Sequence, residues 1–218
     1  MLRILAAALL LCIVKVAGAI SPTCGSSDAS GCCSLCTSSP CSMFFNSSVK
    51  SIGYMALFQC TSLTSVIIPT SVNSIGYGAF AECSSLESVA IPTSVNTIDQ
   101  LAFYKCLSLT SVTIPTSVTF LGNGTFNRCT SLTSVTIPSS VTIIGDGTFY
   151  KCSSLRSVTI ATSVKFLGQS AFQDCTSLTS VTIPTSVTYI GITTTTTMTT
   201  TTTTTITITD TDTTTTTN

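Results

Sequence analysis

The chain has 218 residues but only 8 Lys or Arg and 8 Asp or Glu, so charged residues make up 7 % of the sequence and the formal net charge is zero, against about 25 % charged residues in an average soluble domain. It lacks the basic excess that binds nucleic acid or anionic membranes, and it contains no His, which removes imidazole bases, Ser-His and Cys-His nucleophiles and most catalytic zinc sites. We therefore expect no nucleic-acid partner, no cofactor and no enzymatic activity.

The first nineteen residues have the pattern of a secretory signal peptide. Arg3 precedes an apolar run, residues 4–14, and the small residues Ala17, Gly18 and Ala19 precede the predicted cleavage site. The run is about eleven residues long, well short of the roughly 20 that a membrane-spanning helix needs. We expect a secreted or cell-surface protein without a membrane span in the mature chain, and an uncleaved anchor stays the alternative.

Residues 20–45 are rich in Cys, Ser and Gly, and we assign them to an N-terminal cap. An oxidising compartment favours disulfides in such a segment, and the open end of a stacked fold requires a cap. The count of five leaves one thiol over, which pairs with Cys60, stays free or bridges two chains. The candidate disulfide cysteines are Cys24, Cys32, Cys33, Cys36 and Cys41.

A 23-residue repeat occupies residues 46–192, in six full units and a partial seventh. Each unit ends its apolar segment with Ile-Pro, except that Ala161 replaces Pro in one unit. One cysteine marks each full unit, at Cys60, Cys83, Cys106, Cys129, Cys152 and Cys175. Fixed self-similarity of this length is typical of a solenoid.

The unit around Cys129 shows how one coil is predicted to fold. Residues 132–137 alternate apolar and polar side chains, which indicates a short strand with Val135 inward and Thr136 outward. Pro138 ends the strand because it has no amide proton. Residues 148–152 predict one turn of α- or 3₁₀-helix on the outer side. Since one unit cannot bury its own apolar face, stacked units predict a solenoid with one short parallel strand per coil.

The unit resembles the leucine-rich repeat of the bacterial-surface-protein-A (Treponema pallidum) type, whose pattern is Ala-Phe-x-x-Cys-x-x-Leu-x-x-Val-x-Ile-Pro. The resemblance covers residues 46–192 and recurs six times in one phase. It implies an α/β solenoid with the horseshoe form of leucine-rich-repeat proteins. It also implies a secreted or surface-exposed protein that acts in adhesion or partner recognition rather than in catalysis.

Hydroxyl side chains fill the outward strand positions, which in leucine-rich-repeat proteins form the concave binding sheet. The candidate binding residues are Ser111, Thr113, Ser134, Thr136, Ser157, Thr159, Ser180 and Thr182. A uniform hydroxyl surface lacks the Tyr, Trp and Arg anchors of most protein epitopes, so it favours broad, weak contact with an extracellular protein or glycan. Regular hydroxyl ladders also order water, which makes an ice-binding solenoid a further alternative.

Two other columns of the repeat are expected to be structural. The repeat cysteines are predicted to be buried thiols, because strands spaced by about 4.8 Å hold their Cβ atoms too far apart for disulfides. Phe126 is expected to stack between Phe103 and Phe149. The residues just before the repeat cysteines mix charge signs, as solvated residues do, and are Glu82, Lys105, Arg128, Lys151 and Asp174.

Residues 193–218 form a low-complexity tail in which 20 of 26 residues are Thr. This composition predicts a disordered linker or an O-glycosylated stalk, with residues 206–208 as a weak strand signal. The absence of a recognisable C-terminal cap leaves a truncated gene product as an alternative. Asn46 and Asn123 begin acceptor sequons and are the candidate N-glycosylation sites.

Together these patterns predict a non-enzymatic repeat protein, secreted or on the cell surface, that recognises or adheres to extracellular partners through a sheet rich in Ser and Thr. The alternative is a structural component of a wall or matrix that carries a glycosylated stalk. The ligand, the disulfide pairing and the oligomeric state are left open by the sequence.

Overall fold

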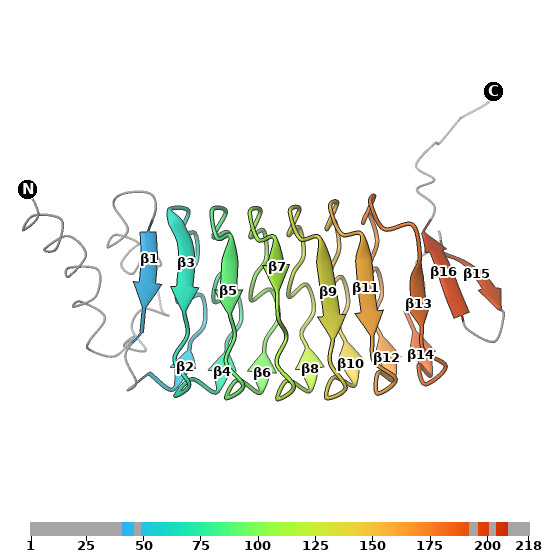
Figure 1. The fold of residues 1–218 in the computed structure, drawn as a ribbon, viewed down its shortest axis with the longest axis horizontal. Coiled ribbons are helices and arrows are strands. Elements are labelled where there is room, and N and C mark those ends of the chain that lie inside the picture. Colours follow the sequence, from blue (N-terminus) through green and yellow to red (C-terminus); the bar gives the residue numbers. More distant parts are fainter. Residues whose placement is uncertain (1–40, 46–48, 192–195, 201–203, 209–218) are drawn as a thin grey trace, which may run out of the picture.

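A computed structural model describes residues 41–45, 49–191, 196–200 and 204–208. These residues wind into coils that stack along one axis, and partner residues on adjacent coils are 23 positions apart (Figure 1). The result is a parallel β-solenoid. The predicted signal peptide, residues 1–19, and residues 20–40 of the predicted cap lie outside the described residues.

Two parallel sheets run along the stack. Sheet A contains, in spatial order, β1 (Cys41–Phe44), β3 (Leu63–Ile67), β5 (Ser88–Ala90), β7 (Ser111–Val112), β9 (Ser134–Ile137) and β11 (Ser157–Ile160). Sheet B contains β2 (Ser51–Ile52), β4 (Ser74–Ile75), β6 (Thr97–Ile98), β8 (Phe120–Leu121), β10 (Ile143–Ile144), β12 (Phe166–Leu167) and β14 (Tyr189–Ile190). The prediction of one strand per coil is therefore wrong, because a complete coil contributes one strand to each sheet.

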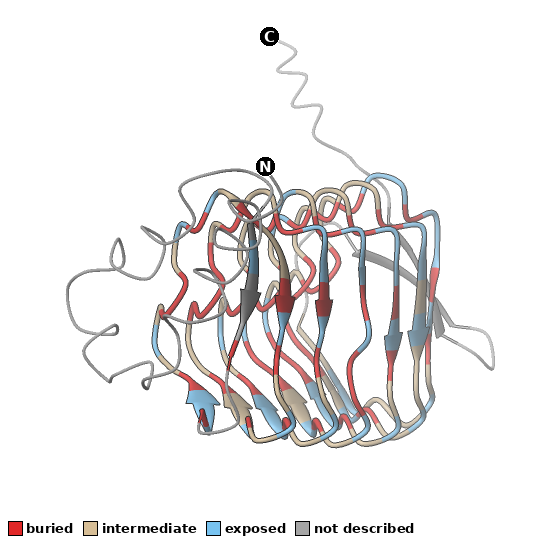
Figure 2. Ribbon diagram, turned by 60° about the vertical axis from the view of Figure 1, so that its left-hand side comes forward, coloured by how far each residue is buried: buried red, intermediate tan, exposed pale blue. Residues whose placement is uncertain are grey.

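The strands of sheet A follow the predicted alternation. In β9, Val135 and Ile137 are buried while Ser134 and Thr136 are exposed, and Figure 2 shows the same alternation of buried and exposed positions in neighbouring strands. The strand ends at Ile137, directly before Pro138, whose missing amide proton cannot continue the ladder. The inward and outward assignments made for this strand are confirmed.

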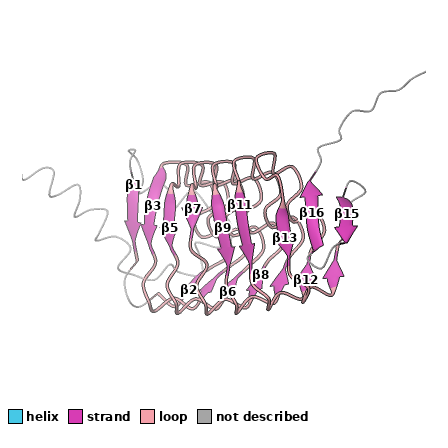
Figure 3. Cartoon of the chain, turned by 45° about the vertical axis from the view of Figure 1, so that its right-hand side comes forward, coloured by secondary structure: helices cyan, strands magenta, loops and turns pink. Residues whose placement is uncertain are grey.

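The outer segment of each coil consists of turns, and no helix occurs within the described residues (Figure 3). The amide of Phe126 donates to the carbonyl oxygen of Thr148 on the next coil at 2.8 Å, and the amide of Arg128 donates to that of Tyr150 at 2.7 Å. Between them, the amide of Asn127 donates within its own coil, three residues back. Because alternate amides are committed to the next coil, the outer segments form isolated turns, and the predicted helical turn is not found in the described residues.

Aromatic rings fill the centre of the stack. The rings of Phe80, Phe103, Phe126, Phe149 and Phe172 stack on one another, with successive centroids 5.1, 5.3, 5.5 and 5.4 Å apart. The first four side chains are fully buried. The predicted stacking of Phe126 between Phe103 and Phe149 is confirmed.

Glycine follows every sheet B strand except β6, which Asp99 follows, and at most of these corners it lets successive coils approach closely. A Cβ atom added to Gly168 would lie 2.4 Å from backbone atoms of Gly145 and Asp146 on the preceding coil. At the same repeat position in the first coil, Gly53 has nothing within 4 Å of such an atom. The close approach at Gly168 therefore arises from stacking on the preceding coil, whereas no described coil precedes Gly53 and the corner at Asp99 accepts a side chain.

A third sheet lies at the C-terminal end of the stack. Here β13 (Val181–Ile183) pairs antiparallel with β16 (Thr204–Ile208), which pairs antiparallel with β15 (Thr196–Thr200). Parts of the predicted low-complexity tail thus form strands, and β16 contains residues 206–208, where the sequence shows a weak strand signal. Their β-branched residues suit an extended backbone. At the other end, β1 adds residues of the predicted cap to sheet A by pairing parallel with β3.

Candidate functional site

The eight candidate binding residues share one surface, the outward side of sheet A and of the chain beside it. We call this surface the hydroxyl face, and it consists of Ser111, Thr113, Ser134, Thr136, Ser157, Thr159, Ser180 and Thr182. All eight side chains are exposed. Thr113 directly follows β7 and Ser180 directly precedes β13, while the others lie within strands.

Strand register aligns these hydroxyls into two files along the stack. Ser134 is paired with Ser111 on one side and with Ser157 on the other, and Thr136 is paired with Thr159. Since adjacent parallel strands lie about 4.8 Å apart, the hydroxyls repeat at that spacing. This register covers five of the eight residues, because Thr113 lies outside a strand and β13, which carries Thr182, pairs with β16 in the third sheet.

The hydroxyl groups of this face are available to a ligand. Within the described part of the chain, none of the eight side chains makes a hydrogen bond to another protein group. Neighbouring threonines behave differently: the Oγ1 atom of Thr133 donates to the carbonyl oxygen of Thr110, and that of Thr110 donates to the carbonyl of Glu87. The face therefore offers unpaired donors and acceptors without charge, which suits polar ligands over a broad area.

The residues before the repeat cysteines form a second outward file, which we call the charged file: Gln59, Glu82, Lys105, Arg128, Lys151 and Asp174. The Nζ atom of Lys105 lies 2.8 Å from Oε1 of Glu82, and Nζ of Lys151 lies 3.9 Å from Oδ2 of Asp174. Hydrogen bonding to Lys105 lowers the pKa of Glu82, and the same contact raises the pKa of Lys105. These contacts join coils and form no pair of carboxylates that would serve acid–base catalysis.

The repeat cysteines line the core as predicted. Cys83, Cys106, Cys129, Cys152 and Cys175 are buried free thiols. Each donates its Sγ proton to a carbonyl oxygen on the preceding coil, for example from Cys129 to Phe103 at 3.2 Å. Burial raises the pKa of Cys83 to about 12 and also raises those of Cys106 and Cys129. Thiols held in this protonated state are poor nucleophiles and poor metal ligands.

Several predicted sites fall at or beyond the limits of the described residues. Cys24, Cys32, Cys33 and Cys36, the side chain of Cys41, and Asn46 all lie outside them. Cys60, the first cysteine of the repeat, is disulfide-bonded and so differs from the five free thiols that follow it.

The sequon at Asn123 is built into the stack. Asn123 is exposed, but its Oδ1 atom accepts a hydrogen bond from the amide of Asp146 on the next coil. Thr125, the third residue of the sequon, is fully buried and its Oγ1 atom donates to the carbonyl oxygen of Gly122. A glycosylation enzyme that must reach this Thr therefore has access only before the coils close.

Sequence analysis missed one outward file on sheet B. The first residues of its strands are Ser51, Ser74 and Thr97 in the first three coils, whereas the later strands begin with Phe120, Ile143, Phe166 and Tyr189. Ile143 and Tyr189 are 38 and 53 % exposed, and the rings of Phe166 and Tyr189 stack at 4.4 Å. Aligning the units by their 23-residue period would have exposed this change from hydroxyl to apolar side chains.

In the described ranges, no helix has the length and apolar character needed to cross a bilayer. Nor do three or more His, Cys, Asp or Glu side chains gather there in a way that could hold a metal ion. The sites that the geometry does offer are extended surfaces on the outside of the stack.

A continuous core, parallel sheets with a fixed 23-residue offset and exposed polar files define the class of parallel β-solenoid repeat proteins. The family model described as BspA type Leucine rich repeat region matches residues 30–133 and 97–218, in six copies. The chain belongs to this family of leucine-rich-repeat proteins. No curated protein matches it significantly.

Two solved structures illustrate the relationship. The T. pallidum leucine-rich-repeat protein TpLRR is 32 % identical, with a TM-score of 0.62 over 69 % of this chain and 68 % of that one. A leucine rich cell surface protein from Faecalibacterium prausnitzii A2-165 is 37 % identical, with a TM-score of 0.56 over 63 % of this chain and 37 % of that one. The second match therefore spans little more than a third of the bacterial protein.

Proposed function

We propose that this protein is a non-enzymatic recognition or adhesion module that acts outside the cell, secreted or at the cell surface. The hydroxyl face is its contact surface, and an extracellular protein or glycan is its partner. The observation that carries this proposal is the exposure of eight hydroxyl groups on one surface, five of them in strand register and none hydrogen-bonded through its side chain to a described residue.

The chemistry of the hydroxyl face favours a repetitive polar ligand. A hydroxyl group both donates and accepts, and it contributes a modest net hydrogen-bond energy of about 0.5–1.5 kcal/mol. Single contacts are therefore weak, and useful affinity requires several rungs to be engaged together. An extended ligand with its own regular hydroxyl groups, such as a glycan chain, meets that condition.

The extracellular setting of the proposal is supported by the leader-like residues 1–19, by the Cys-rich segment and by family membership. The disulfide at Cys60 also fits an oxidising compartment. We propose that it ties the first coil to the N-terminal cap and thereby shields the open end of the core. The cap assignment of residues 20–45 and the glycosylation of Asn46 and of the Thr-rich tail belong to the same proposal.

The test is an array of glycans and matrix proteins probed with the full-length chain and with a double variant, Thr136→Glu with Thr159→Glu. Both side chains point to solvent from paired rungs, so the fold tolerates the change, with a mutual repulsion on the order of 1 kcal/mol. The hypothesis expects the two carboxylates to abolish binding of any ligand that the parent chain retains.

The matched control is Thr119→Glu with Thr142→Glu, which places the same two charges on exposed threonines of adjacent coils beside sheet B. This control variant is expected to bind like the parent chain. If both double variants lose binding equally, or if only the control loses it, the ligand does not bind at the hydroxyl face.

A further inference from the structure

The charged file has a backbone that disfavours the residues it carries. All six positions have positive φ angles, between 55° and 62° for those from Glu82 to Asp174. This left-handed conformation has a low free-energy cost for Gly and a modest one for Asn and Asp, and a higher cost for other residues. Lys105, Arg128 and Lys151 nevertheless adopt it. The other left-handed position of the coil holds glycine in three coils, Gly78, Gly124 and Gly147, and non-glycine residues in the other three, Met55, Leu101 and Ser170. The left-handed backbone is therefore a repeating feature of the coil, and the side chains of the charged file differ along it.

The pairing of charges leaves a cation at the centre of the file. Lys105 forms an ion pair with Glu82 on the preceding coil, and Glu82 also accepts a hydrogen bond from Nε2 of Gln59 one coil earlier. Asp174 lies beside Lys151 on the C-terminal side. Arg128, between the two lysines, is exposed and forms no ion pair with any described residue. Both acids lie at the outer coils, so the three central coils present only positive charge along this file.

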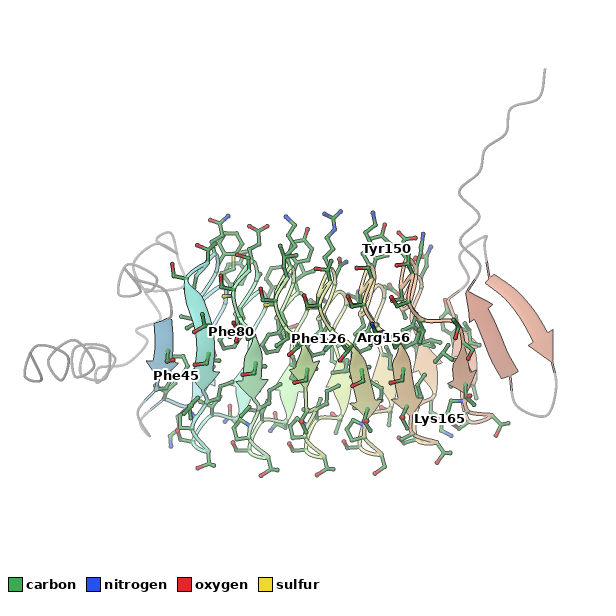
Figure 4. The ribbon with its side chains drawn as sticks, turned by 45° about the horizontal axis from the view of Figure 1, so that its top comes forward. Phe45, Phe80, Phe126, Tyr150, Arg156 and Lys165 are labelled. Carbon is green, nitrogen blue, oxygen red and sulfur yellow. The ribbon has the colours of Figure 1, made fainter. Side chains whose placement is uncertain are left out.

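Aromatic rings flank this central cation. The column next to the charged file carries Tyr104, Asn127 and Tyr150 on the same three coils, and Tyr150 lies along the charged edge in Figure 4. The Nζ atom of Lys105 lies 5.1 Å from the ring centroid of Tyr104, and that of Lys151 lies 5.2 Å from that of Tyr150. At about 4.8 Å per coil, the two tyrosines are separated by roughly 10 Å with a smaller side chain between them.

Asn127, at the base of this interval, has an unused polar atom. Its Oδ1 is buried and has no hydrogen-bond partner, although buried polar atoms are normally satisfied. Because this oxygen is buried, the Asn127 side chain must turn outward before a donor on a molecule bound between the tyrosines supplies the missing hydrogen bond. The interval therefore combines a free guanidinium, two aromatic rings and an unpaired acceptor.

We propose that Arg128, Tyr104, Tyr150 and Asn127 form a binding site for an acidic polysaccharide, separate from the hydroxyl face. The guanidinium of Arg128 binds a carboxylate or sulfate group in bidentate geometry. The tyrosine rings pack against the apolar edges of the sugar ring, whose hydroxyl group donates to Asn127. Lys105 and Lys151 lie one coil away on either side and attract the charges of neighbouring sugars.

The experiment measures binding of the full-length chain to immobilised alginate, which carries carboxylates, to dextran sulfate and to uncharged dextran. Arg128→Gln is expected to weaken binding to the charged polymers about tenfold, since one bidentate contact is lost. Arg128→Lys keeps the charge but loses the fork geometry, so it is expected to recover only part of that loss. Binding must also weaken as salt is added. Whichever polymer depends more on Arg128 identifies carboxylate or sulfate as the preferred group.

Arg156→Gln is the matched control, because it removes the same charge from an exposed arginine directly before β11, also labelled in Figure 4. It is expected to leave binding unchanged. Equal effects of the two arginine variants, equal binding to uncharged dextran, or equally Arg128-dependent binding to poly-glutamate would overturn the proposal. The Thr136→Glu and Thr159→Glu variant retains this site, so failure here and failure of the hydroxyl face are distinguishable.

Discussion

The interior phenylalanine file and the outward charged file belong to the same short segment of the coil, yet they vary very differently. Phe80, Phe103, Phe126, Phe149 and Phe172 are identical and stack face to face. Two residues further along, the charged file contains four side-chain types from Glu82 to Asp174. The interior must repeat because each ring is the packing surface of the next one. The exterior is free of that demand, so its differences between coils carry information about binding.

A change in the interior file is expected to destabilise the fold more than any change on the exterior. Phe126→Ala is expected to lower the free energy of unfolding by roughly 3–5 kcal/mol, because the rings on both sides lose a fully buried partner. Since each coil contacts only its neighbours, the stack is expected to melt in two separate transitions. Calorimetry checks both expectations, and a melting curve that overlays the parent curve would contradict them.

A substitution at a corner glycine tests the close approach of successive coils and is expected to lower stability by a smaller amount. Gly168→Ala is expected to cost about 1–3 kcal/mol, because the new methyl group meets backbone of the preceding coil at 2.4 Å. Gly53→Ala, the same change at an equivalent corner with nothing within 4 Å, is expected to cause no loss. Urea unfolding of the two variants measures the difference, and equal destabilisation would assign the effect to the local backbone instead of stacking.

The smallest expected effect concerns the buried thiols and pH. Burial raises the pKa of Cys129 above its ordinary value, whereas in the unfolded chain its thiol ionises near about pH 8.5. The unfolded state therefore loses this proton first, so the stabilisation is complete below about pH 8.5 and is lost as the pH rises above it. For each such thiol, the free energy of unfolding is expected to fall by about 1 kcal/mol between about pH 8 and about pH 9.5.

Cys129→Ala tests this linkage by removing one titrating group. Urea unfolding at the two pH values is expected to show a drop in stability that is smaller in the variant than in the parent by that single-thiol amount. An identical drop in both proteins would show that Cys129 ionises alike in the folded and unfolded chains.

Sequence reasoning predicted the features that depend on neighbours along the chain. Alternation around Val135 located the strand, Pro138 located its end, and the 23-residue period located the stacking of Phe126. It missed the sheet B strands because two residues, as in β10, are too few to show alternation. It predicted an outer helix that is not found, because local propensity does not reveal hydrogen bonds to other coils. The amide of Arg128 donates to the carbonyl oxygen of Tyr150 on the next coil instead of continuing a helix.

The two candidate surfaces also differ in how far the sequence predicts them. Exposure of Thr136 and Thr159 followed from strand periodicity alone and is confirmed. The contact of Lys105 with Glu82 instead depends on which side-chain ends meet across coils, and the sequence analysis had treated the whole charged file as solvated. Only the structure, which shows the side-chain contacts between coils, distinguishes the unpaired Arg128 from Lys105 and Lys151, which are paired.

The partners are 23 residues apart in sheet A and in sheet B, and the bonded groups of the outer turns are 22 residues apart in each coil. These fixed offsets govern how such a chain can change its length. Inserting a single residue would change the offset of every pair that spans the insertion, so it would disturb all three ladders where that coil meets its neighbours. Duplicating a whole coil adds one rung to each ladder and leaves every existing hydrogen bond in place. Lengthening by whole coils would therefore extend the outer surfaces without requiring a new core.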